Sequence, residues 1–218
     1  REVGARDIAR GMVAGAAGAA AGAAAMALAA AGGLEVFATG GIGGVHRGAP
    51  FDESGDLLAL ARTPLVVTCA GAKSILDLPA TLERLETLNV PVVGWHTDEL
   101  PGFFTRTTGL PVPHRADSAE AIARIARAHW GLGLRSAILV VVPPPAATAL
   151  AQGEVDAAVG RALAAAERTG VRGAALTPFL LGAVVAATEG RSLAANLALL
   201  ETNARLAGEI AVALRALA

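Results

Sequence analysis

The residue whose chemistry stands apart in this 218-residue sequence is Lys73, because it is the single lysine and every other fixed positive charge is an arginine. Lys73 follows the apolar run PLVVTCA (64–70) by a few small residues, and the SILDL stretch directly after it is expected to begin a helix. A partly buried ammonium group at a helix N-terminus has a lowered pKa, and the neutral amine attacks carbonyl carbons to form imines. Arginine cannot do this, since guanidinium stays protonated. A surface lysine retained by chance is the alternative, and we favour the imine-forming nucleophile.

A second candidate site is the glycine-rich segment ATGGIGGVHRG (38–48), which follows the apolar run LEVFAT (34–39). Its glycine spacing matches neither the phosphate-binding loop of nucleotide hydrolases nor the dinucleotide fingerprint. Four glycines within five residues let backbone amides approach an anion, and His46 and Arg47 add side-chain donors. A tight turn whose glycines only satisfy backbone geometry is an equally open interpretation.

A third candidate is the acidic segment FDESGDL (51–57). Asp52, Glu53 and Asp56 offer the oxygen ligands that a hard divalent cation prefers, and Asp52 and Asp56 would share one face of a helix. The alternative is that Ser54 or Asp52 caps a helix and the acids are solvated. The residues by themselves favour capping.

Strand and helix patterns alternate along the chain. Valine-rich apolar runs, typical of strands covered on both faces, occur at 34–39, 64–70, 90–95 and 137–142. Helical patterns occur at 76–88, at 117–130 with Asp117 as N-cap, at 154–168 ending before Gly170, and from Ser192 to the end of the chain. This alternation predicts an α/β fold, a three-layer α/β/α arrangement with a mostly parallel sheet. Ligands in such folds bind at the carboxyl ends of the strands.

The composition bounds the partners and the compartment. Residues 1–218 are expected to form a single domain, and a net charge of −1 gives no basic stripe for nucleic acid and no polybasic membrane patch. The alanine and glycine stretch at 13–33 is weakly hydrophobic, so we expect a buried helix there and no membrane span. Cys69 is the single cysteine and cannot form an internal disulfide, which favours a core position and a cytoplasmic location.

Five motifs then occur together in a fixed order. They read FATGGIGGVHRG, FDESGDL, CAGAKSILDL, LTPFLL and SLAANLAL. Together they resemble the pseudouridine-5'-phosphate glycosidase family, also called the pseudouridylate synthase or indigoidine synthase A-like family. The similarity runs from residue 1 to residue 218 and corresponds to the C-terminal two-thirds or so of the family fold.

The resemblance implies an α/β/α enzyme, commonly trimeric, that binds a divalent metal such as Mn²⁺. Such enzymes reversibly cleave the C-glycosidic bond of pseudouridine 5'-phosphate to uracil and ribose 5-phosphate. A carbon–carbon glycosidic bond has no heteroatom leaving group to protonate, so the two-carboxylate chemistry of ordinary glycosidases does not suffice. An imine between an amine and the opened sugar supplies an electron sink instead.

The resemblance also implies residue roles. Lys73 matches the family lysine that forms an imine with C1 of the opened ribose, and Asp56 matches the metal ligand, which acts largely through water. Asn196 matches the asparagine that contacts the base. The residues predicted to frame the substrate are Thr39, Gly40, Gly41, Gly43, Gly44, His46 and Arg47.

The sequence departs from the family pattern at positions that the resemblance places near the substrate. Glu2 stands in place of a lysine, Ala20 and Ala21 in place of two threonines, and Val142 in place of an asparagine. A glutamate that acts as general acid/base belongs to a family segment that precedes the matched region. Two alternatives therefore stay open: an enzyme that joins ribose 5-phosphate to another aromatic compound, and an inactive or truncated homologue that lacks the general acid.

Overall fold

The computed structural model describes residues 2–48 and 51–217, and its centre is a five-stranded sheet in which every pairing is parallel. The strand order is β3-β4-β7-β5-β6. The strands are β3 (Val36–Ala38), β4 (Val66–Cys69), β7 (Ile138–Val141), β5 (Val92–Trp95) and β6 (His114–Ala116). The four apolar runs of the sequence thus form strands as predicted. β6 has no such run in the sequence.

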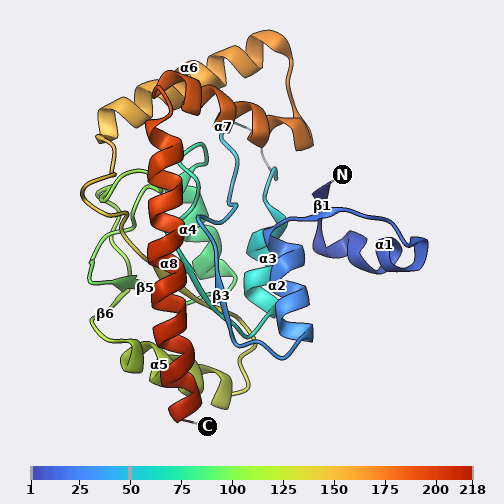
Figure 1. Ribbon diagram of the computed structural model, residues 1–218, viewed down its shortest axis with the longest axis vertical. Coiled ribbons are helices and arrows are strands. Elements are labelled where there is room, and N and C mark those ends of the chain that lie inside the picture. The colour runs from blue at the N-terminus through green and yellow to red at the C-terminus, as the bar shows by residue number, and fades with distance from the viewer. Residues whose placement is uncertain (1, 49–50, 218) are drawn as a thin grey trace.

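Helices cover both faces of this sheet, because neighbouring residues of a strand point to opposite sides. Val67 and Cys69 of β4 pack into a core with the helices α2 (Gly22–Ala31), α3 (Gly55–Arg62), α4 (Leu78–Thr87), α6 (Gln152–Thr169) and α7 (Leu176–Ala187). Val66 of the same strand faces α5 (Ala119–Gly131) and the C-terminal half of α8 (Arg191–Ala216). Figure 1 shows α8 crossing the molecule in front of the sheet. The predicted three-layer α/β/α arrangement is confirmed.

The prediction of one buried helix at 13–33 is wrong. Helix α1 (Ile8–Ala14) ends at Gly15, which adopts a left-handed conformation with φ of 60°, and helix α2 begins only at Gly22. Between them, β2 (Ala19–Ala20) pairs with β1 (Glu2–Val3) in a separate two-stranded sheet, beside which α1 projects from the body (Figure 1). Among the described residues, no helix is both long and apolar enough to cross a membrane.

Three predicted helix starts also need correction. α4 begins at Leu78 with Asp77 as its N-cap, so no helix opens directly after Lys73. Ser118 caps α5 by accepting from the Ala121 amide, whereas the Asp117 carboxylate turns outward to Arg115 and His96. α8 begins after Gly190, and the Ser192 hydroxyl is buried in its first turn against Thr188. The predicted left-handed end of α6 at Gly170 is confirmed, with φ of 68°.

Candidate active site

Two adjoining cavities lie beyond the carboxyl ends of β3 and β4. The inner cavity, of about 270 Å³, is lined by Thr39, Gly40 and Asn196, and the outer one, of about 540 Å³, is lined by His46, Asp52 and Ser54. Lys73 and Asp56 line both cavities, together with Gly22 and Leu181. The structure therefore brings the lysine and the acid of two separate motifs to one cleft.

Lys73 lies half-buried in a turn that the glycine-rich loop holds by its backbone. The Lys73 amide donates to Ile42 O over 3.1 Å, and the Asp77 amide donates to Val45 O over 2.9 Å. Gly71, which precedes the turn, has φ of 86°, and a Cβ there would lie 2.5 Å from Pro101 O. The position of Lys73 thus depends on the neighbouring loop and on a residue without a side chain.

The glycines of this loop allow close packing. Gly40, Gly41, Gly43 and Gly44 all have ordinary backbone angles, so left-handed geometry does not explain them. A Cβ on Gly43 would lie 2.1 Å from Ser54 Oγ, and one on Gly44 would lie 2.4 Å from Thr81 Oγ1. The amides of Ile42, Gly43 and Val45 donate to protein acceptors, at Gly71 O, Asp56 Oδ2 and Thr81 Oγ1. These three amides serve the protein itself, whereas Gly40 and Gly41 line the inner cavity.

Asp56 is a buried carboxylate in the first turn of α3. It is 8% exposed, and its Oδ2 accepts from the Gly43 amide over 2.8 Å. Ser54 caps the helix by accepting from the Asp56 amide, as the capping interpretation predicted. Asp52 precedes the helix, so the prediction that Asp52 and Asp56 share a helix face is wrong.

The donor set suits a hydrated hard cation better than a fully protein-coordinated one. Among the described residues, no three His, Cys, Asp or Glu side chains are close enough to hold a metal together. Asp56 and Asp52 nevertheless supply carboxylate oxygens to one cavity, with the Ser54 hydroxyl beside them. Hard cations such as Mg²⁺ and Mn²⁺ retain waters and need few carboxylates, so these residues fit an ion bound largely through water.

Arg47 lies outside the set of residues that line the two cavities. Its Nε donates to Leu76 O over 3.0 Å and its Nη2 to Ser74 O over 3.4 Å, so it braces the turn that follows Lys73. Cys69 is fully buried on β4, and burial raises the pKa of its thiol to about 12. The prediction that Cys69 is a core residue is confirmed.

Sequence reasoning missed several residues of the cleft. Gly22 at the start of α2 lies so close to Asp56 that a Cβ there would be 2.8 Å from either carboxylate oxygen. Phe103 has φ of 68°, and its ring lies 2.6 Å from the position of a Cβ on Gly41. Apolar side chains that also line the inner cavity are Phe104, Leu181, Val185, Leu193 and Leu200. The one feature of the sequence that could have pointed to these residues is the adjacent pair Phe103 and Phe104, which is unusual in a chain with 3% aromatic residues.

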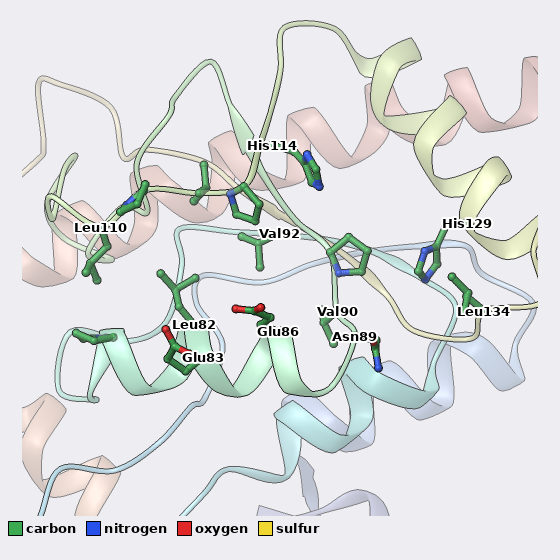
Figure 2. A pocket seen from close by; sticks show the side chains of 15 residues that line it. Leu82, Glu83, Glu86, Asn89, Val90, Val92, Leu110, His114, His129 and Leu134 are labelled. Atoms are coloured by element: carbon green, nitrogen blue, oxygen red, sulfur yellow. The ribbon is translucent and has the colours of Figure 1, made fainter.

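A larger groove of about 690 Å³ lies at the opposite edge of the sheet, where β5 and β6 begin. Figure 2 shows Val90, Val92 and Leu110 in it, with Glu86 on α4 below and His114 above. None of the predicted site residues lines this groove. The candidate active site is therefore the cleft that contains Lys73.

Sequence comparison identifies the family. Residues 1–213 match the family described as indigoidine synthase A like protein. The chain belongs to this family. It is 66% identical over 214 residues to a pseudouridine-5'-phosphate glycosidase of Gemmatimonas aurantiaca, covering 98% of this chain and 70% of the relative. It is 52% identical over 214 residues to a protein of the same name from Myxococcus xanthus, covering 97% of this chain and 71% of the relative.

Two solved structures of the family share the fold. A prealnumycin C-glycosynthase in complex with ribulose 5-phosphate superposes with a TM-score of 0.93 at 39% identity, over 99% of this chain and 72% of the other. An indigoidine synthase A-like protein of Thermotoga maritima gives a TM-score of 0.91 at 39% identity, over 99% of this chain and 71% of the other. At 39% identity, these two proteins resemble this chain in sequence as well as in fold.

The positions that depart from the family pattern do not all face the cleft. Ala21 lines the outer cavity, next to Gly22. Val142, in contrast, is 2% exposed and packs in the core formed with α5 and α8. Ala20 lies exposed in the small β1–β2 sheet and lines neither cavity. The expectation that these replacements all fall on the substrate side is thus wrong for Val142 and Ala20.

Proposed function

We propose that this chain is a pseudouridine-5'-phosphate glycosidase, which cleaves the C-glycosidic bond reversibly to give uracil and ribose 5-phosphate. The observation that carries the proposal is that Lys73, the only lysine, lines a cleft beyond the ends of β3 and β4 together with the buried Asp56. Relatives of up to 66% identity over nearly the whole chain carry this name. The C-glycosynthase relative, in complex with ribulose 5-phosphate, supports a phosphorylated sugar as ligand.

In the proposed mechanism the amine of Lys73 forms a bond to C1 of the ribose as the bond between C1 and the ring oxygen breaks. The electron pair of the broken bond goes to the ring oxygen, which takes up the proton that the amine gives up, so that the sugar ring is opened. The bond between C1 and the base carbon then breaks, and its electron pair goes to the base carbon, which takes up a proton. C1 is left as an imine with Lys73 Nζ, and water hydrolyses this imine to ribose 5-phosphate and the free amine. Because each step is reversible, the same residues serve synthesis.

The other cleft residues orient the reactants. Asn196 presents an amide near Gly40 in the inner cavity and can pair with the edge of a base, while His46, in the outer cavity, adds a donor toward the sugar phosphate. Phe103 and Leu181 give the inner cavity apolar walls that exclude water from the imine. A divalent ion, for which we propose Mn²⁺, would be held by Asp56 and Asp52 and would supply positive charge near the phosphorylated sugar.

We also propose that the chain works as a homotrimer in the cytoplasm. Leu193, Leu197 and Leu200 form an apolar stripe on α8 with exposed fractions of 51%, 62% and 38%, and Leu193 and Leu200 of this stripe also line the inner cavity. Contiguous exposed leucines of this kind are typical of protein–protein contacts. The unpaired, buried Cys69 fits a reducing compartment.

Trapping of the imine tests the proposal directly. The protein is incubated with ribose 5-phosphate and borohydride, which reduces an imine to a stable amine, and its intact mass is measured before peptide mapping. We expect a sugar adduct on Lys73 and none in Lys73→Arg, which keeps the charge but not the nucleophile. A folded, Mn²⁺-loaded protein without an adduct would contradict the imine mechanism and favour an inactive homologue.

A second candidate function is the joining of ribose 5-phosphate to another aromatic compound. The relation to a prealnumycin C-glycosynthase and the Ala21 replacement in the outer cavity favour it. Release of uracil from pseudouridine 5'-phosphate separates the two. An adduct at Lys73 without uracil release would support the second candidate.

A further inference from the structure

The pairing of β3 with β4 slips by one residue where β3 enters the cleft. Regular parallel pairing gives the bonds Val66 N–H to Glu35 O, at 2.8 Å, and Thr39 N–H to Thr68 O, at 3.0 Å. The next bond of the same pattern would run from the Ala70 amide to Thr39 O. The Ala70 amide instead donates to Gly40 O over 2.8 Å. One extra residue is thus present in the β3 strand at Thr39–Gly40. As a result, the Ala70 amide of the neighbouring strand does not donate to Thr39 O.

A side chain of α8 takes the place of the missing ladder donor. Asn203 Nδ2 donates to Thr39 O over 2.8 Å and lies 3.4 Å from Gly40 O. Figure 1 shows how α8 runs alongside β3, and the helix packs on both β3 and β4. Asn203 is only 1% exposed, so water cannot substitute for this donor.

The orientation of the Asn203 amide leaves its own oxygen without a partner. Two carbonyl oxygens require the nitrogen to point at the loop, and Asn203 Oδ1 is then buried with no hydrogen bond among the described residues. An unpartnered buried acceptor destabilises a fold, and natural sequences tolerate this mainly at functional sites. Because Asn203 Oδ1 has no partner in the described part of the chain, the asparagine costs the core stability. We therefore attribute its presence to the need to hold the Thr39–Gly40 segment in position.

We infer that Asn203 is a positioning residue: it holds the slipped Thr39–Gly40 segment so that both residues face the sugar-binding cleft. An extra residue in one strand changes the direction of the residues that follow it. The slip therefore places Thr39 and Gly40 at the wall of the inner cavity. Asn196 lies two helical turns before Asn203 on α8, and a Cβ on Gly40 would be 3.0 Å from its Oδ1. The same helix therefore carries the base-contacting candidate and the residue that fixes the surface opposite it. The inference rests on the proposed function.

Thr68 offers a matched control. Its Oγ1 donates to the backbone oxygen of Asn203 over 3.0 Å, and Thr68 is fully buried. Thr68→Val removes a buried hydrogen bond between α8 and the sheet without touching the carbonyls of Thr39 and Gly40. Asn203→Leu removes the donor to those carbonyls at nearly constant volume.

The experiment compares wild type, Asn203→Leu and Thr68→Val in two readouts. The first is hydrogen exchange of the peptide that covers residues 39–44, which we expect to accelerate in Asn203→Leu and to change little in Thr68→Val. The second is the ribose 5-phosphate concentration that half-saturates borohydride trapping at Lys73, which we expect to rise about tenfold in Asn203→Leu and less than about twofold in Thr68→Val. Asn203→Ala replaces Asn203→Leu if the leucine variant does not fold.

The outcomes separate the two proposals. Equal shifts in both variants, or no shift in either, would overturn the positioning role of Asn203. If the wild-type protein gives no adduct in borohydride trapping, the proposed function is refuted. Hydrogen exchange of the peptide that covers residues 39–44 then still decides whether Asn203 holds the loop.

Discussion

The Oδ2 oxygen of Asp56 accepts a hydrogen bond of 2.8 Å from the Gly43 amide, which joins the first turn of α3 to the glycine-rich loop. Asp56 is buried and lines both cavities beside Lys73. Both oxygens of this carboxylate lie against Gly22, where a Cβ would be 2.8 Å from either of them, so the position of Asp56 also requires a residue without a side chain there. An acid and a loop from two separate motifs thereby become one unit of the site.

Replacement of Asp56 by asparagine is expected to weaken Mn²⁺ binding by about ten- to a hundredfold, because it removes a charged oxygen ligand of nearly equal size. Titration calorimetry with Mn²⁺ measures the effect. Glu53→Gln is the matched control, since the Glu53 carboxylate pairs with Arg84 over 2.9 Å and lines neither cavity. Equal Mn²⁺ affinity in wild type and Asp56→Asn would exclude Asp56 as a ligand.

Gly43→Ala is expected to destabilise the protein by about 1–3 kcal/mol, because the new Cβ would lie 2.1 Å from Ser54 Oγ and 2.4 Å from Ser54 Cβ. Denaturant unfolding gives the free energy of unfolding. Gly160→Ala, in the exposed middle of α6 with open space around it, should leave stability unchanged or raise it by up to about 1 kcal/mol. Similar stabilities of Gly43→Ala and wild type would show that the loop can move away from Ser54.

The Cys69 thiol should resist alkylation in the folded protein. Burial raises its pKa to about 12, so at pH 8 almost no reactive thiolate is present, and the side chain has no exposed surface. Labelling with iodoacetamide, followed by intact mass, should proceed only as fast as the chain opens, and at once in denaturant. Rapid labelling of native protein at pH 8 would contradict the buried position of β4.

His129 predicts a loss of stability in mild acid. Ser136 Oγ donates its hydrogen to Asn89 O over 2.6 Å, so His129 Nε2 must donate to Ser136 Oγ over 2.8 Å, which the neutral ring can do. Burial lowers the pKa of His129 below its ordinary value of 6.5. Below pH 6.5 the His129 side chain is protonated more readily in the unfolded chain than in the folded one. The contribution of neutral His129 to the free energy of unfolding is therefore fully present above pH 6.5 and is lost as the pH falls through the pKa of the folded state.

The measurement is the free energy of unfolding between pH 7.5 and pH 5, in wild type and His129→Gln. The glutamine nitrogen retains a donor for Ser136 but does not titrate, so the variant should lose less stability across this range. Identical pH profiles would rule out His129 as the titrating group.

The sequence by itself identified four of the five strands of the central sheet, the motifs and the candidate site residues. Four valine-rich runs became β3, β4, β5 and β7, because a strand covered on both faces needs apolar residues at every position, which is a local pattern. Lys73 and Asp56 were identifiable as candidates because of residue type and motif order. The glycines of 40–44 were visible as a cluster, although the sequence left their purpose open between anion binding and a turn.

Only the tertiary structure decided how these pieces meet. The glycines prove to be sites of close approach to Ser54 and Thr81, which lie on other segments of the chain. The break in the 13–33 stretch and the caps at Ser118 and Gly190 were misjudged, since several neighbouring residues can begin or end a helix equally well and packing selects among them. Asn203 gave no signal in the sequence because its role arises from the packing of α8 across β3 and β4, a contact between distant parts of the chain.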